Sequence, residues 1–164
     1  DLSTNSSYDY KLDPNWAGRF WCCRDGEANC DQYGSAVFLA EFLFKSYEDS
    51  EFYDISFVDG FTIPKSIEPD GKDGDGYNCG APTCSSLPSC PKELQIMSDA
   101  CQSACAAFGT DEYCCTGNYN DPKKCKGSEY ADKFKAGCPD AYSYAYDDAK
   151  NTYGCKAHKY TVTF

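Results

Sequence analysis

Carboxylates are the side chains best placed to carry chemistry in this sequence. The 164 residues include 26 Asp and Glu but a single histidine, His158. One histidine cannot supply a multi-histidine metal site, and it leaves a histidine-based catalytic triad little support. We therefore look for acid–base chemistry among the carboxylates, and we expect neither a resident metal nor a cofactor.

Glu41 stands out because of its neighbours. It lies inside the run Val-Phe-Leu-Ala-Glu-Phe-Leu-Phe at residues 37–44. A charge among apolar residues is costly to bury unless it is paired or faces a wet cleft. An edge strand blunted by a charge explains the same pattern equally well.

Asp54 and Asp59 belong to one segment of the chain. Asp54 falls within a predicted strand over residues 52–58, and Asp59 follows five residues later. At opposite strand parity, the two side chains share a face only if the chain bends near Asp59 and Gly60. Asp-Gly is also a favoured turn pair, and taken alone that explains Asp59 better.

Other charged positions are ambiguous on the sequence alone. Asp140 follows Pro139 and is typical of a turn. An ion pair explains Arg19 as well as direct contact with a ligand does. Residues 69–76 (Pro-Asp-Gly-Lys-Asp-Gly-Asp-Gly) lack the alternating ligands and terminal Glu of a calcium-binding EF-hand, so we expect a solvated turn there.

The elements that would position these residues are mostly strands. Aromatic and branched residues predict strands at residues 8–12, 17–22, 37–44, 52–58 and 61–63. Helical periodicity marks residues 92–108, and a shorter helix over 128–136 would begin after Ser128 as N-cap. Residues 160–164 alternate strictly and predict a strand that returns to the β-rich half.

The charge balance restricts the partners. The chain has 15 Lys and Arg, a net charge of −11 and a pI near 4.4. Such a surface repels nucleic acid and anionic lipid. The longest apolar run, residues 35–44, is far below the ~20 residues that span a bilayer. We expect a neutral or cationic ligand, no nucleic acid and no transmembrane segment.

The cysteine content indicates secretion. The chain has 13 cysteines without the paired CxxC spacing of a zinc module, and ten of them lie within residues 79–155. That pattern is typical of a disulfide framework in an extracellular protein. Asn5 begins an Asn-Ser-Ser glycosylation sequon, and the first residues lack signal-peptide features. We expect a secreted, processed glycoprotein modified at Asn5.

Several motifs resemble one known family. They are Phe-Tyr-Asp-Ile-Ser-Phe-Val-Asp-Gly-Phe at 52–61, Gly-Arg-Phe-Trp at 18–21, Leu-Ala-Glu-Phe at 39–42, Asp-Glu-Tyr-Cys-Cys at 111–115 and Cys-Pro-Asp-Ala-Tyr-Ser-Tyr at 138–144. In this order the chain resembles the thaumatin-like (osmotin/thaumatin-type, pathogenesis-related) proteins. The match runs from about Tyr8 to the last residue.

The resemblance implies a mainly β fold, a β-sandwich beside a disulfide-rich loop and helix domain with an acidic cleft between them. The sandwich would comprise residues 1–78 and 156–164, the disulfide-rich domain 79–138, and a small third lobe 139–155. The resemblance also implies five disulfides: Cys79–Cys155, Cys84–Cys138, Cys90–Cys101, Cys105–Cys114 and Cys115–Cys125. The adjacent Cys114 and Cys115 seldom bond each other, which agrees with separate partners.

The sequence also departs from the family pattern. The usual N-terminal hairpin and the C-terminal Phe-Cys-Pro are missing, and one thiol among Cys22, Cys23 and Cys30 is left over. We therefore expect a cleaved fragment or a short form. Its uncovered sheet edge would invite a second chain or a dimer.

The resemblance assigns a cleft made by Arg19, Glu41, Asp54, Asp59 and Asp140. We expect Glu41 to donate a proton and Asp59 to act as nucleophile or base. Asp54 and Asp140 would shape the field, and Arg19 would orient a carboxylate. An open cleft favours wide carboxyl spacing, hence an attacking water and inversion. Aromatic platforms for sugar rings would come from Tyr53, Phe61 and Tyr142.

The function implied is binding of β-1,3-glucan in antifungal defence or cell-wall remodelling, with weak endo-β-1,3-glucanase activity as a further expectation. The alternative is a protein inhibitor of a glycoside hydrolase such as a xylanase, with an inert cleft. Substitution of Glu41 separates the two, because inhibition through a loop would survive it and glucan hydrolysis would not.

Overall fold

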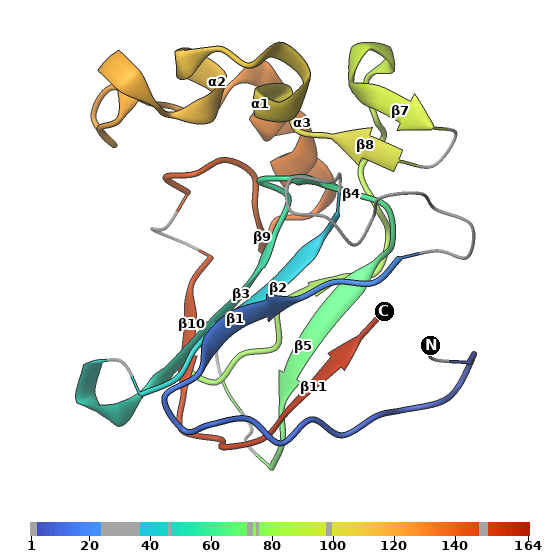
Figure 1. The fold of residues 1–164 in the computed structure, drawn as a ribbon, viewed down its shortest axis with the longest axis vertical. Helices are drawn as coiled ribbons and strands as arrows, with labels where there is room; N and C mark the ends of the chain where they lie inside the picture. Colours follow the sequence, from blue (N-terminus) through green and yellow to red (C-terminus); the bar gives the residue numbers. More distant parts are fainter. Residues whose placement is uncertain are drawn as a thin grey trace.

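The fold is described from a computed structural model, which covers residues 3–23, 37–45, 47–71, 74, 76–97, 100–147 and 151–164. Most of its strands gather in one part of the molecule, and most helices lie at one end of them beside a few short strands (Figure 1). Among these residues, no helix is long and apolar enough to cross a membrane.

The first sheet carries most of the residues of interest. Its strands run in the order β1 (Ala17–Phe20), β2 (Leu39–Leu43), β3 (Glu51–Ser56) and β10 (Tyr153–Cys155), all antiparallel, and β9 (Ala141–Tyr142) pairs in parallel with β3. The expected strands at 17–22, 37–44 and 52–58 are thus confirmed, each with slightly shorter bounds. Tyr53 and Ile55 point into the core, so Phe52 and Asp54 face the other way.

A second sheet packs against the core side of the first. It consists of β11 (Tyr160–Thr163), β5 (Lys65–Pro69) and β6 (Thr83–Cys84). The centroid of the Tyr160 ring lies 5.0 Å from that of Tyr53 in a tilted arrangement and 5.4 Å from that of Phe42 in a T-shaped one, so aromatic contacts join the two sheets. The returning strand at 160–164 is therefore confirmed.

A buried carboxylate also joins the sheets. Glu51 at the start of β3 accepts hydrogen bonds from the Tyr160 hydroxyl at 2.7 Å and from the His158 backbone N–H at 3.0 Å, and His158 Nδ1 lies 3.0 Å from it. Burial alone raises the pKa of Glu51, but these hydrogen bonds outweigh it and the pKa is lowered. The carboxylate thus fixes β11 onto the sandwich.

The helical end contains a small third sheet and short helices. The sheet consists of β4 (Gly60–Phe61), β8 (Ala100–Gln102) and β7 (Gln95–Met97). The helices are α1 (Ala104–Phe108), α2 (Asp111–Cys114) and α3 (Glu129–Gly137), with 3-10 turns η2 (Lys92–Leu94) and η3 (Gly117–Tyr119). A further 3-10 turn, η1 (Tyr47–Asp49), connects β2 to β3 at the opposite end of the first sheet (Figure 1). As expected, Ser128 caps α3, its hydroxyl accepting from the Ala131 N–H at 3.3 Å.

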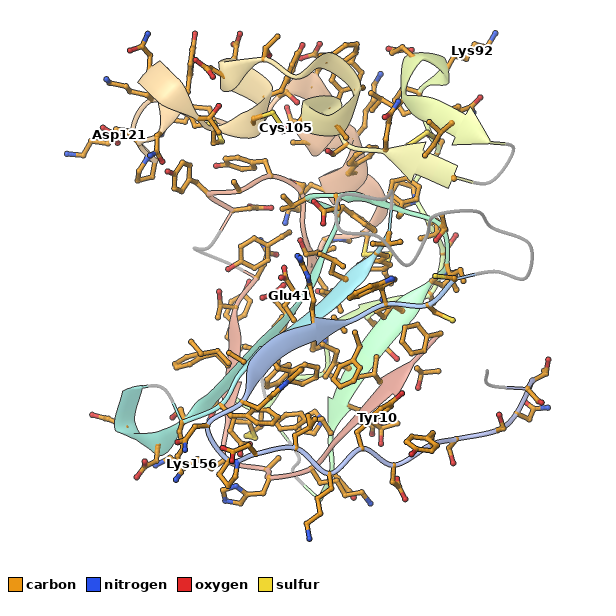
Figure 2. The ribbon with its side chains drawn as sticks, viewed as in Figure 1. Tyr10, Glu41, Lys92, Cys105, Asp121 and Lys156 are labelled. Atoms are coloured by element: carbon orange, nitrogen blue, oxygen red, sulfur yellow. A yellow bond between two sulfur atoms is a disulfide. The ribbon has the colours of Figure 1, made fainter. Side chains whose placement is uncertain are left out.

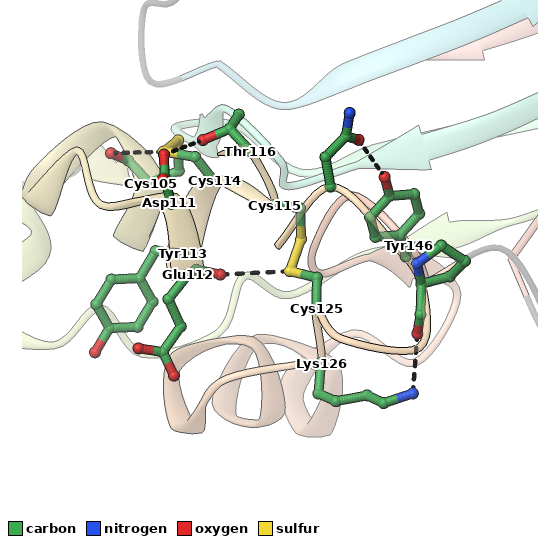
Figure 3. Close-up of a disulfide and its surroundings, with 12 residues drawn as sticks. Cys105, Asp111, Glu112, Tyr113, Cys114, Cys115, Thr116, Cys125, Lys126 and Tyr146 are labelled. Atoms are coloured by element: carbon green, nitrogen blue, oxygen red, sulfur yellow. Dashed lines mark hydrogen bonds between the residues drawn. A yellow bond between two sulfur atoms is a disulfide. The ribbon is translucent and has the colours of Figure 1, made fainter. Parts of the chain in front are cut away.

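From Cys79 onward, disulfides stabilise the chain in place of a large apolar core. The structure has the five pairs that the resemblance implies: Cys79–Cys155, Cys84–Cys138, Cys90–Cys101, Cys105–Cys114 and Cys115–Cys125. Figure 3 shows Cys115–Cys125 holding the chain after α2, beside the hydrogen bond from Tyr146 to Asn120. Cys23 is also disulfide-bonded, the Cys22 thiol donates to the Cys23 carbonyl at 3.7 Å, and Cys30 lies outside the described residues.

Two predicted elements are wrong. Residues 8–12 form no strand, because they lack a ladder partner among the described residues; Tyr8 and Tyr10 are exposed and pack against each other. The helix expected over 92–108 is limited to α1. The segment before α1 turns back as β7 and β8, and β8 is held by β4 and by the Cys90–Cys101 disulfide.

The structure bears on two further expectations, the third lobe at residues 139–155 and the turn at residues 69–76. Residues 139–155, expected as a third lobe, supply β9 and β10 to the first sheet, because pairing with β3 satisfies their backbone groups. The turn at 69–76 lies partly outside the described residues, since Lys72, Asp73 and Asp75 are not described. Asn5 is exposed, and its glycosylation stays a prediction.

Candidate active site

The acidic side chains meet because of strand register. Arg19 on β1 is directly opposite Glu41 on β2, and Glu41 is directly opposite Asp54 on β3. Opposed residues in a sheet share a face, with Cβ atoms about 5 Å apart. The three side chains therefore form one row across the outer face of the first sheet, which explains why Glu41 is tolerated within an apolar strand.

Asp59 joins this row through a bend in the chain. The Gly60 N–H donates to the Phe57 carbonyl at 2.9 Å, and Gly60 has a φ of +119°, a conformation that favours glycine. The bend directs Asp59 to the same face as Asp54, as the strand parity required. The Arg19 Nη1 and Asp59 Oδ2 atoms lie 3.9 Å apart, so Arg19 pairs with Asp59 beside Glu41.

These four residues line an open cavity of about 710 Å³, within the range of ligand pockets. Figure 2 shows Glu41 midway along the sheet, facing the space below the helical end. The remaining walls combine apolar and hydroxyl groups. They include Leu39, Phe42, Leu43, Phe52, Ser56, Val58, Tyr142, Ala145 and Thr152.

Partial burial raises the pKa values of two carboxyls in this cavity. For Glu41, burial is the largest cause; the positive charge of Arg19 lowers the pKa, and the negative charge of Asp59 raises it further. Burial also raises the pKa of Asp59, again against the pull of Arg19. The pKa values of both carboxyls are therefore raised, and burial is the largest cause in each case.

Three residues expected in the site lie elsewhere. Tyr53 is 1% exposed and Phe61 3% exposed, so neither ring can offer a face to a ligand. The Tyr53 hydroxyl donates instead to the Gly80 carbonyl at 2.6 Å. Asp140 is not among the lining residues, because its carboxylate accepts from the Thr83 N–H at 3.1 Å and bonds the Tyr153 hydroxyl.

Tyr142 does line the cavity, and its hydroxyl hydrogen-bonds that of Thr152. Two further lining residues were not expected from the sequence: Ser56, which hydrogen-bonds Glu41, and Phe52, which precedes Asp54 by two positions on the same face. Strand parity was the available signal for both, because residues 52, 54 and 56 share one side of a strand.

A metal-binding role finds no donor set here. Among the described residues, no group of three or more His, Cys, Asp or Glu side chains is arranged to hold a metal ion. The Arg19 guanidinium instead supplies the positive charge nearest to Asp59. The arrangement thus places two carboxyls with raised pKa values beside the Arg19 guanidinium, which is suited to acid–base chemistry on a neutral ligand.

Comparison with known proteins identifies the family of the chain. The model of the thaumatin family matches residues 1–164. Pathogenesis-related thaumatin-like protein 3.5 of Cryptomeria japonica is 42% identical, over 99% of this chain and 76% of that protein. A protein of Prunus avium named glucan endo-1,3-beta-glucosidase is 36% identical, over 100% of this chain and 77% of its own length. Pathogenesis-related protein 5 of Arabidopsis thaliana is 37% identical, over 100% and 77% respectively. This chain belongs to the thaumatin family.

Proposed function

We propose that the protein is secreted, that it binds β-1,3-glucan in the cavity above the first sheet, and that Glu41 and Asp59 hydrolyse the bound chain slowly. Its role would lie in antifungal defence or cell-wall remodelling. The observation that carries the proposal is the meeting of Arg19, Glu41, Asp54 and Asp59 in one open cavity. The name of the Prunus avium relative supports glucan as the ligand class.

The proposed chemistry divides the work between two carboxyls. Burial raises the pKa of Glu41, which favours its protonated form, and in the proposed step Glu41 protonates the glycosidic oxygen as the bond to the leaving sugar breaks. Asp59, paired with Arg19, takes a proton from the attacking water. The water then adds to the anomeric carbon from the opposite face. An open cavity has room for that water, so we propose inversion of configuration.

The other two charged residues have supporting roles. Asp54 lies opposite Glu41 on the neighbouring strand and adds a third carboxyl to the row, where it can accept hydrogen bonds from a bound sugar. Arg19 holds Asp59 in place and opposes the rise of both pKa values. Catalysis needs Glu41 protonated and Asp59 ionised at the same time. We therefore expect a bell-shaped pH profile with its optimum on the acidic side.

The test is the release of reducing ends from a linear β-1,3-glucan, with retention on insoluble glucan measured in parallel. We compare the parent with Glu41→Gln and Asp59→Asn, and we use Glu68→Gln as the control because Glu68 is an exposed carboxylate on β5. Both cavity variants should lose hydrolysis, and the control should retain it.

The outcomes separate the parts of the proposal. If the parent binds glucan without releasing reducing ends, the hydrolytic part fails and the binding part stands. If the parent does not bind glucan, the whole proposal fails. Inhibition of a xylanase that survives Glu41→Gln would assign the activity to another surface.

A further inference from the structure

A second cavity adjoins the acidic one on the same sheet. It has a volume of about 620 Å³, and two of its lining residues, Phe52 and Thr152, also line the acidic cavity. Its other walls include Ser50, Tyr77, Asn78 and Lys156. Figure 2 shows Lys156 near the end of the first sheet that is farther from the helices, and Glu41 between Lys156 and the helices. The two cavities therefore lie one after the other along the strands.

Strand register explains how the two cavities are joined. Phe52 is opposite Leu43 on one side and Gly154 on the other, one position further along the face than Asp54. A Cβ atom at Gly154 would lie 3.3 Å from the Phe52 ring. The Phe52 ring thus lies over Gly154, which has no side chain, and it does so at the junction of the two cavities.

Tyr77 provides a second exposed ring, and contacts with the first sheet hold it in place. Its side chain is 48% exposed, and its ring packs against that of Tyr153 with 5.3 Å between centroids. The Tyr77 carbonyl accepts from the Gly154 N–H at 2.9 Å, and the Cys79–Cys155 disulfide follows directly. A large exposed ring that is held on a sheet in this way is suited to binding, because little conformational freedom is lost when a ligand arrives.

The chemistry of the second cavity differs from that of the first. Its described lining residues include Lys156 and no carboxylate, so the second cavity offers hydrogen bonds but no acid–base pair. Ser50 and Asn78 add a hydroxyl and an amide. Aromatic faces together with neutral hydrogen-bonding groups match a hydroxyl-rich, uncharged ligand such as a sugar unit.

We propose that the second cavity is an additional saccharide subsite, which holds units of the same β-1,3-glucan chain beyond those above Glu41 and Asp59. This inference rests on the proposed function of the acidic cavity. Phe52 and Tyr77 contact sugar faces, and Lys156 hydrogen-bonds sugar hydroxyls. The subsite positions the chain and takes no part in proton transfer, so its signature is a preference for long oligosaccharides over short ones.

The test measures the affinities for a β-1,3-linked trisaccharide and hexasaccharide by calorimetry. The parent should bind the hexasaccharide more tightly, because only the longer chain fills both cavities. Tyr77→Ala should reduce the ratio of the two affinities about two- to tenfold, the value of one aromatic contact. Lys156→Ala, which removes an exposed side chain and disturbs no packing, should reduce it less. Tyr10→Ala, at an exposed tyrosine outside both cavities, should leave the ratio unchanged.

Each outcome decides a different point. A hexasaccharide that binds the parent no more tightly than the trisaccharide overturns the subsite and leaves the proposed function intact. A ratio that neither Tyr77→Ala nor Lys156→Ala lowers, with the thermal midpoints of both variants near that of the parent, also overturns it. Absence of binding by either sugar removes the proposed function, and the subsite with it.

Discussion

The protein contains a buried lysine that should make its stability rise with pH. Lys65 on β5 is 3% exposed, and its amine donates to the Phe38 carbonyl and, at 3.4 Å, to the Phe20 carbonyl. Its Nζ also lies 4.6 Å from the centroid of the Phe164 ring. Burial lowers the pKa of Lys65 to about 7, an effect that the nearby Cys22 opposes.

The magnitude follows from linkage between protonation and folding. In the unfolded chain Lys65 has a pKa of about 10.4, so between pH 7 and pH 10 the unfolded state binds more protons than the folded state. The free energy of unfolding therefore rises with pH across this window. Between pH 6 and pH 9 the rise is at most about 3 kcal/mol. The carbonyls and ring faces favour the charged amine, which makes this figure an upper limit.

The assay is denaturant unfolding of the oxidised protein at pH values from 6 to 9, for the parent and for Lys65→Met. Methionine has a similar length and no charge, so the variant should be more stable than the parent at pH 6, and the difference should shrink towards pH 9. Parallel stability profiles for the two proteins would show that the buried amine does not change its protonation on folding, and would refute the reasoning.

Three further predictions concern other parts of the fold. Glu51→Gln should lower the free energy of unfolding by about 1–3 kcal/mol near neutral pH, because a depressed pKa gives stability that is present above the ordinary range of Glu and lost in acid; denaturant titration at pH 7 and pH 3 measures it, and an equal loss at both pH values would contradict it. Arg19→Ala should shift the pH profile of glucan hydrolysis to higher pH, because Arg19 lowers the pKa of Asp59; an unchanged profile would show that the Arg19–Asp59 ion pair does not affect the pKa that governs hydrolysis. Mild reduction should expose residues 79–155 to protease before the strands within 37–63, and first cleavage in those strands would reverse the assignment.

Local patterns predicted the parts of the site that depend on strand parity. The apolar run around Glu41 and the aromatic run around Asp54 predicted two strands, and their register then gives the row on the sheet face. The Asp-Gly pair at residues 59 and 60 predicted the turn that brings Asp59 to the same face. Neither pattern specifies which strands are neighbours. Only the family resemblance predicted that these residues share one cleft.

Long-range contacts explain most of the failures. Residues 92–108 have helical periodicity, but pairing of β8 with β4 and the Cys90–Cys101 disulfide override it over most of that range. The sequence around Lys65 did not indicate that this lysine is buried, because the groups that cover it, the Phe38 carbonyl and the Phe164 ring, are distant from it in sequence. Asp140 was expected in the cleft, yet the Thr83 backbone, which is distant in sequence, holds it outside.

The titration of the Glu41 carboxyl, followed by carbon-detected NMR with and without a β-1,3-linked hexasaccharide, tests the central claim most directly. The account predicts that the pKa of Glu41 lies above the ordinary range of glutamate in the free protein and moves when the sugar binds, because the ligand displaces water from the cavity. An ordinary pKa that the sugar leaves unchanged, with the sugar-induced shifts confined to the helical end, would contradict it.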